Sequence, residues 1–166
     1  ASSHNLMLGT SPTEFSPNIT MTRGMLVTVL YRMNGSPSVS GKTPFTDVRT
    51  DEWYSAAVLW AYQNGIVTGM SDTTFAPINN VTREQMATIL FRYTKTAAPD
   101  KAKASADLSG FADAGSVNDW AVDAMRWAVG QKLIAGITLE QSVYLQPRGN
   151  ATRAQAATVL TRYYAQ

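Results

Sequence analysis

The chain of 166 residues is 45% hydrophobic and 16% charged, which supports a packed core and excludes an intrinsically disordered protein. Fourteen Lys and Arg against twelve Asp and Glu, scattered along the chain, give a net charge of +2, which argues against nucleic-acid binding. There is no cysteine, and the single histidine lies in a polar N-terminal stretch, so no disulfide framework, Cys/His metal site or cofactor is expected. No apolar run approaches the roughly 20 residues of a membrane span, and no charged-then-apolar leader stands at the start of the sequence, so we expect a soluble, processed or excised segment without membrane insertion.

The first predicted helix begins at Thr22. An apolar stripe at helical spacing is formed by Met25, Val29, Leu30 and Met33. Thr22 is a suitable N-cap, but three positions later Met25 stands where a capping box needs Glu or Gln. We therefore expect the capping box of this helix to be broken.

A second type of helix follows, with Asp51 as the expected N-cap and Gly65 as the expected stop. Its predicted buried face consists of Tyr54, Ala57, Val58, Ala61 and Tyr62. A later copy of this helix has the corresponding face Ala121, Ala124, Met125, Ala128 and Val129. The two copies predict a helix–loop–helix unit that occurs more than once.

The stretch NNVTREQMATILFRY, residues 79–93, predicts a helix from Thr82 with an intact capping box formed with Gln85. Arg83 then falls in the first turn, where the helix macrodipole disfavours a cation by roughly 0.3 to 1 kcal/mol. Free amides at the helix start and a guanidinium beside them can together hold a carboxylate, which removes this penalty. The stretch therefore predicts an anion site at Arg83.

The chain repeats itself. Three stretches align when they start at Phe15, Phe75 and Leu145, and residues 45–69 align with residues 111–136. The predicted repeats are 1–35, 44–95 and 110–166, joined by linkers rich in Pro, Ser, Gly and Lys. The first repeat is partial, because it has no counterpart of the helix that follows Trp53.

The repeated pattern F-x-D-V, W-Y-x-x-A-V, G-I-V-x-G, F-x-P and T-R resembles the S-layer homology domain family over nearly the whole chain. The resemblance implies a mainly α fold, in which tandem helix–loop–helix repeats form a pseudo-threefold, three-pronged spindle with grooves between repeats. In Gram-positive bacteria such grooves hold secondary cell wall polysaccharide, often with a ketal-linked pyruvate. The resemblance thus implies a secreted, non-catalytic anchoring module of the cell wall or S-layer, with an acidic cell-wall polysaccharide as its partner.

The same resemblance and the anion argument give the candidate arginines, which are Arg23, Arg83 and Arg153. Their helices are expected to be capped by Thr22, Thr82 and Thr152. An alternative, which can coexist with ligand binding, is that each arginine pairs with the F-x-D carboxylate, Asp47 or Asp113. The broken box makes the Arg23 site the weakest, so Arg83→Ala is expected to cost more affinity than Arg23→Ala. Loss of Arg83 is not expected to destabilise the free protein, because it relieves the dipole.

Aromatic and glycine positions complete the candidate site. Trp53 and Trp120 either pack in the core or stack on a sugar ring while Asp47 or Asp113 accepts hydrogen bonds from sugar hydroxyls. Trp60 and Trp127, further inside the helices, are expected in the core. Three glycines are expected to serve backbone turns, with close approach of a ligand as a second role: Gly9, Gly69 and Gly136. The segment 71–74 lacks the spaced carboxylates of a calcium loop, so no metal is expected.

Two other functions remain open. One is a protein-interaction or lattice-building module whose Trp and Tyr side chains face another protein. A glycan-cleaving enzyme is less favoured, because the acidic residues recur as isolated repeat positions rather than as a catalytic pair.

The partial first repeat also predicts that its helix lacks a packing partner. The chain is then expected either to self-associate there or to be a clipped form of a longer one.

Overall fold

The computed structural model describes residues 18–166, so the prediction at Gly9 lies outside the described residues. The helices are α1 (Arg23–Met33), α2 (Ser55–Gln63), α3 (Arg83–Ala97), α4 (Val122–Gly130) and α5 (Arg153–Tyr164), with 3₁₀ turns η2 (Pro99–Lys101), η3 (Ala114–Ser116) and η4 (Asp119–Ala121). Two short strands, β1 (Ile137–Leu139) and β2 (Ser142–Tyr144), form an antiparallel hairpin. The predicted mainly α fold is confirmed. Within the described residues, no helix combines the length and apolar character needed to cross a membrane.

A closed ring of backbone hydrogen bonds joins the segments that precede α1, α3 and α5. The amide of Met21 donates to the carbonyl of Ala151 (2.8 Å), Ala151 donates to Val81 (2.9 Å), and Val81 donates to Met21 (2.8 Å). These three residues are fully buried. Each repeat therefore contacts both of the others at the point where its Thr-Arg helix begins.

The opposite ends of the same helices are linked by side chains. Asn34, at the end of α1, donates to the hydroxyl of Tyr93 on α3 at 2.9 Å. Thr94 on α3 donates to the hydroxyl of Tyr163 on α5 at 3.0 Å. Successive Thr-Arg helices are thus held together at both ends.

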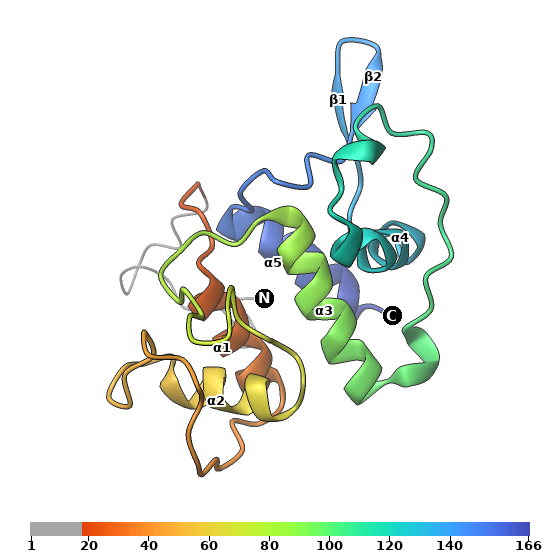
Figure 1. Cartoon of the computed structure of the whole chain (residues 1–166). Coiled ribbons are helices and arrows are strands. Elements are labelled where there is room, and N and C mark those ends of the chain that lie inside the picture. Colours follow the sequence, from red (N-terminus) through yellow and green to blue (C-terminus); the bar gives the residue numbers. More distant parts are fainter. Residues whose placement is uncertain (1–17) are drawn as a thin grey trace.

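Each tryptophan-bearing helix packs on the Thr-Arg helix of the preceding repeat (Figure 1): α2 lies against α1, and α4 lies against α3. Trp60 of α2 meets Tyr31 with ring centroids 5.7 Å apart, and Trp127 of α4 stacks on Phe91 at 5.3 Å. Both tryptophans are buried, which confirms their predicted place in the core.

The helix without a partner is not the one that the sequence indicated. We expected α1 to be exposed, but α1 packs against α2. The Thr-Arg helices α1 and α3 each pack against a tryptophan-bearing helix. Among the described residues, α5 has no such partner. Thr161 occupies the α5 position that corresponds to Tyr31 and Phe91. Each tryptophan-bearing helix packs on the Thr-Arg helix of another repeat. The tryptophan-bearing helix that the first repeat lacks therefore leaves α5, and not α1, without this partner among the described residues.

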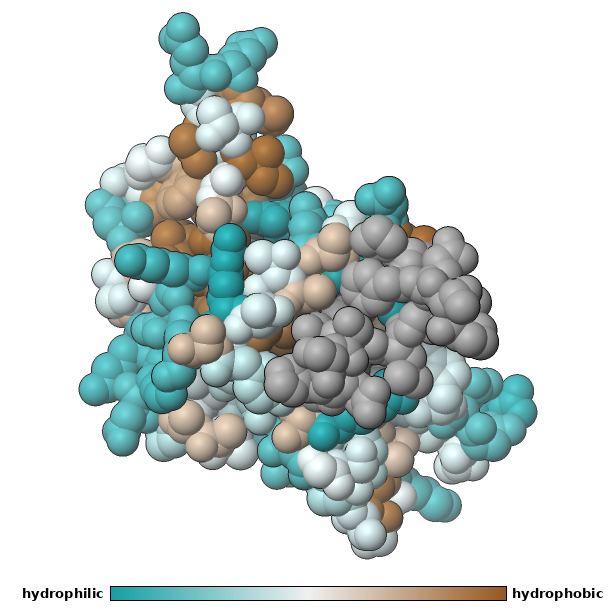
Figure 2. Space-filling view, turned by 180° about the vertical axis from the view of Figure 1, so that it is seen from behind, coloured by the Kyte–Doolittle hydropathy of each residue, from teal (hydrophilic) through white to brown (hydrophobic). Residues whose placement is uncertain are grey.

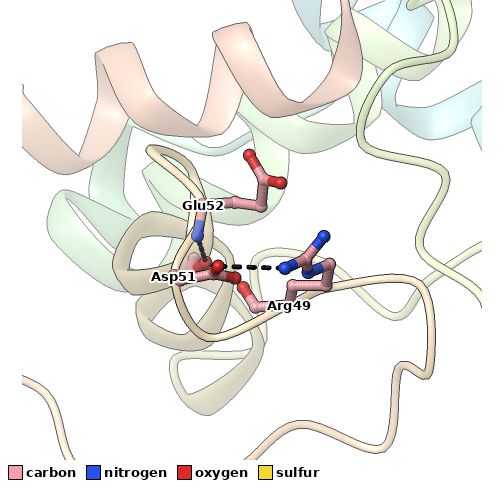
Figure 3. Close-up of polar contacts among 4 residues, drawn as sticks. Arg49, Asp51 and Glu52 are labelled. Carbon is pink, nitrogen blue, oxygen red and sulfur yellow. Dashed lines mark hydrogen bonds and ion pairs between the residues drawn. The ribbon is translucent and has the colours of Figure 1, made fainter.

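The entry into α2 also differs from its prediction (Figure 3). Asp51 is not the N-cap; Tyr54 holds that position, and Asp51 instead pairs with Arg49 at 3.0 Å. The hydroxyl of Ser55 accepts the amide of Glu52 at 3.1 Å and donates to the carbonyl of Arg49, which closes the turn. The predicted stop is correct, since Asn64 is the C-cap and Gly65 has φ +69°. The assignment of Tyr62 to the buried face of this helix was wrong, because its side chain is 38% exposed.

All three Thr-Arg helices begin with a closed capping box, so the prediction of a broken box at α1 was wrong. Thr22 accepts the amide of Met25 at 3.1 Å, and the amide of Thr22 donates back to the Met25 sulfur at 3.4 Å. In α3 the returning acceptor is the side-chain oxygen of Gln85, at 3.1 Å. The thioether is a weak acceptor in the place of an amide oxygen.

Replacing Met25 with glutamine is therefore expected to stabilise the protein by about 0.5 kcal/mol, because a stronger acceptor closes the same box. Thermal unfolding followed by circular dichroism measures the change. The reverse substitution at the matched position of α5, Gln155→Met, is expected to lower stability by a similar amount. An unchanged melting temperature in both variants would contradict the role assigned to the N3 side chain.

Candidate functional site

Asp47 and Arg23, from neighbouring repeats, hold the same two-residue turn from opposite sides. The Asp47 carboxylate accepts the amides of Phe75 (2.9 Å) and Ala76 (2.7 Å). Nε of Arg23 donates to the carbonyl of Phe75 at 2.8 Å. Ala76 has φ +59°, a left-handed conformation that costs a non-glycine residue roughly 1 to 2 kcal/mol. The acid and the arginine stabilise this turn.

The next repeat contains the same arrangement. Asp113 accepts the amides of Leu145 (2.7 Å) and Gln146 (2.8 Å), and Gln146 has φ +48°. Arg83 donates from Nε to the carbonyl of Leu145 at 2.8 Å and from a terminal nitrogen to the carbonyl of Ala135 at 3.1 Å. The F-x-D acid and the T-R arginine are therefore linked through the turn at residues 145–147, Leu-Gln-Pro, which corresponds to F-x-P.

This geometry corrects two predictions. Within the described residues, Arg23 and Asp47 form no ion pair, nor do Arg83 and Asp113. The amides at the helix starts are also occupied: Arg23 N donates to Asn79 O and Arg83 N to Gly149 O, each at 2.9 Å. The helix starts therefore offer no free amides to an anion, and any anion site depends on side chains.

A pocket of about 340 Å³ lies where three repeats meet. Arg23 of α1 reaches it from the first repeat, Arg92 of α3 and Gly69 from the second, and Trp120 of η4 from the third. Its remaining lining is polar at Thr68, Gln85 and Thr88 and apolar at Val67, Met70 and Ile89. We call it the arginine pocket. It brings together three of the predicted site residues: Arg23, Gly69 and Trp120.

The arginine pocket carries two cations close together. Burial lowers the pKa of Arg23 to about 10; Asp47 opposes this shift and Arg92 adds to it. Burial also lowers the pKa of Arg92. Both guanidinium groups remain charged at neutral pH, and no residue among the described lining carries a carboxylate. An anion bound there would relieve the repulsion between the two groups.

Gly69 and Trp120 shape the pocket differently. Gly69 has φ +87°, and a Cβ there would lie 2.7 Å from the carbonyl oxygen of Ser71, so only glycine allows this backbone path. Trp120 is 53% exposed, so it is not a core residue. Its ring is therefore available to a ligand.

The corresponding position one repeat later is built differently. Arg162 takes the place of Arg92 and donates to the carbonyl of Leu133 at 3.3 Å. Gly136 lies under the β1–β2 hairpin, where a Cβ would meet the side chains of Val143 and Phe111. The hairpin projects from the body in Figure 1, and Figure 2 shows apolar surface below its hydrophilic tip. Here Arg83 and Arg162 donate to backbone carbonyls, whereas within the described residues the Arg92 side chain makes one hydrogen bond, to the Thr68 hydroxyl at 3.5 Å.

The other candidates lie elsewhere. Trp53 is 59% exposed and is not part of the arginine pocket. The Arg153 side chain is buried, and its amide donates to the carbonyl of Ile19 at 2.9 Å. The F-x-P turn that would correspond to it begins at Phe15, outside the described residues. Among the described residues, no group of three or more His, Cys, Asp or Glu side chains could hold a metal ion.

Arg92 was missed by the sequence analysis. Its signal was present, because the three aligned stretches all end in arginine: Arg32, Arg92 and Arg162. The sequence analysis assigned no role to these positions. The pocket depends on a loop and a tryptophan from other parts of the chain, which one helix pattern does not reveal.

Curated relatives share long alignments with this chain. It is 34% identical over 156 residues to an endoglucanase of Bacillus sp., which covers 94% of this chain and 16% of that protein. It is 32% identical over 148 residues to the surface-layer 125 kDa protein of Lysinibacillus sphaericus (89% and 12%), and 29% identical over 158 residues to an amylopullulanase of Thermoanaerobacterium thermosulfurigenes (95% and 8%). The chain thus spans only 8 to 16% of the length of these relatives.

A solved structure, an undecaheme cytochrome from the S-layer of Carboxydothermus ferrireducens, aligns with 88% of this chain and 21% of its own, at a TM-score of 0.46 and 21% identity. The S-layer homology domain model matches residues 44–87 and 110–157, more than half of the chain. These two segments contain both Asp-held turns and Trp120. The chain belongs to the S-layer homology domain family.

Proposed function

We propose that this chain anchors a larger protein to the cell wall by binding an acidic, pyruvylated wall polysaccharide in the arginine pocket. The main support for the proposal is that two positively charged side chains, Arg23 and Arg92, line one pocket whose described lining has no carboxylate. Membership of the family and the S-layer relative indicate a location at the cell surface. Several relatives are named as enzymes, but the matched region here is the S-layer homology domain alone.

The lining of the pocket supports a ligand with a carboxylate beside an apolar group. A guanidinium binds a carboxylate through parallel hydrogen bonds. Met70, Ile89 and Trp120 offer apolar contact in the same pocket. A ketal-linked pyruvate carries a carboxylate and a methyl group on one carbon, and the sugar ring that bears it presents an apolar face to an aromatic side chain.

The proposed fold of the repeats is the pseudo-threefold, three-pronged spindle. The ring formed by Met21, Val81 and Ala151 supports it, because each of three equivalent residues donates to the next in a closed cycle. Within this fold the arginine pocket lies between repeats, so a ligand there contacts residues from all three.

Calorimetry with a synthetic sugar glycoside bearing a ketal-linked pyruvate tests the function directly. The same glycoside with its carboxylate methyl-esterified is the control, since it keeps the shape and loses the charge. Binding of the acid but not of the ester is expected. Equal capture of the protein by intact wall and by wall stripped of polysaccharide would instead favour a protein partner.

Binding is expected to weaken, but not to vanish, as salt concentration rises. A carboxylate held by arginines at an open pocket is screened within about 8 to 10 Å at physiological ionic strength, whereas aromatic contact with the sugar is insensitive to salt. Titrations in increasing sodium chloride measure the slope. Complete loss of affinity at moderate salt would contradict the contribution of Trp120.

The proposal includes association between copies through one face of α5, on which Ala154 and Ala157 are partly buried and Thr161 is exposed. That face carries small or polar residues, Ala154, Ala157 and Thr161, where α3 has Glu84, Ala87 and Phe91. Because small side chains bury little apolar area, this association is expected to be weak. Light scattering at several concentrations tests it, and a monomer at every concentration contradicts it.

A further inference from the structure

Glu84, the second residue of α3, is a buried acid that does not line the arginine pocket. It is only 2% exposed. Both of its carboxylate oxygens accept hydrogen bonds from one residue, Asn118: one from the backbone amide at 3.0 Å and the other from the side-chain amide. Because two hydrogen bonds join this buried carboxylate to one residue, they restrict the orientation of Asn118 as well as its distance from Glu84.

The partner directly precedes the turn that carries the pocket tryptophan. Asn118 is the N-cap residue of η4, but its side chain makes no capping bond and is bound to Glu84 instead. Trp120 lies two residues further on, and its side chain is half exposed. Glu84 therefore attaches the Trp120 turn to α3, the same helix that supplies Ile89 and Arg92 to the arginine pocket.

The preceding pair of repeats lacks this attachment. Gly24 takes the place of Glu84, and a Cβ there would already lie 2.9 Å from the carbonyl oxygen of Pro77. Asp51 takes the place of Asn118, and it is exposed and paired with Arg49. Nevertheless α1 and α2 pack like α3 and α4. The fold thus forms without the attachment, and the attachment is found where its tryptophan lines the pocket.

We propose that Glu84 is a positioning residue that holds Trp120 at the mouth of the arginine pocket and so raises affinity for a sugar ring stacked there. This inference rests on the proposed function of the pocket. A side chain that is half exposed on a short turn samples several positions unless the turn is fixed. Fixing it before the ligand arrives removes an ordering cost from binding.

The test uses the Trp53→Phe variant as its background, because the other two tryptophans, Trp60 and Trp127, are buried and Trp120 is then the exposed one. Glu84→Gln removes the negative charge and replaces one of the two accepting oxygens with an NH2 donor, so the two charge-assisted bonds that hold Asn118 are lost or weakened. The fluorescence anisotropy of the free protein is expected to fall through the contribution of Trp120, because the buried Trp60 and Trp127 contribute equally in every variant. Affinity for the pyruvylated glycoside is expected to fall about three- to tenfold, the value of one aromatic contact.

The double variant Glu84→Gln/Asn118→Asp restores a donor–acceptor pair and is expected to recover both anisotropy and affinity. Asn118→Ser keeps the backbone bond and is expected to show part of the effect. Glu140→Gln, on the exposed turn of the hairpin, makes the same charge change and is expected to alter neither.

Unchanged anisotropy and affinity in a folded Glu84→Gln protein would overturn the inference. So would a double variant that recovers thermal stability but not affinity, since Glu84 would then be only structural. A background protein that does not bind the glycoside contradicts the proposed function. The anisotropy of the free variants then still decides whether Glu84 positions Trp120.

Discussion

Replacement of Arg92 with alanine is expected to weaken binding of the pyruvylated glycoside by about tenfold to hundredfold. A hydrogen bond to a charged group contributes about 1.5 to 3 kcal/mol, and the change removes one of the two cations of the arginine pocket. In the free protein the Arg92 side chain makes a long hydrogen bond to the Thr68 hydroxyl, at 3.5 Å. Stability of the free protein is therefore expected to change little.

The repeat supplies a matched control for this experiment. Arg32 occupies the position in α1 that Arg92 occupies in α3, and it does not line the pocket. Arg32→Ala is expected to leave affinity unchanged when both variants are titrated by calorimetry at the same salt concentration. Equal losses in the two variants would show that the ligand does not depend on the arginine pocket.

Replacement of Arg83 with alanine is expected to destabilise the free protein by about 2 to 3 kcal/mol. The change leaves the buried carbonyl of Leu145 without its donor and removes the bond to Ala135. For a domain of this size the loss corresponds to a fall in melting temperature of about 5 to 10 °C. This reverses the expectation from the sequence, which considered the helix dipole alone.

Arg148→Ala is the matched control, because Arg148 is an exposed arginine in the same turn region and its loss leaves the carbonyl of Leu145 paired. Its melting temperature is expected to stay within about 1 °C of the wild type, as for most surface substitutions. If Arg83→Ala melts like the wild type, the bonds to the F-x-P turn contribute nothing measurable. The sequence-based ranking of Arg83 above Arg23 in affinity stays a prediction, but its stated reason, the broken box at Met25, no longer holds.

Local features could be predicted well because they depend on neighbours in the chain. The caps at Thr22, Thr82 and Thr152 and the stop at Gly65 lie where the sequence indicates. The buried stripe of α3 is also correct. Met25 was misjudged because a pattern of residue types takes no account of a sulfur acceptor.

The sequence by itself determined the family and the mainly α fold, because the aligned stretches carry their own caps, stripe and turn residues. Only the tertiary structure decided which side chains meet. The main helix pairs join neighbouring repeats, α1 with α2 and α3 with α4, so within the described residues the helix without such a partner is α5 rather than α1. Asp47 and Arg23 meet through the F-x-P turn, and Arg23, Arg92 and Trp120 form one pocket, because three repeats converge on a ring of backbone hydrogen bonds. Such contacts between distant segments leave no periodic signal in any one of them.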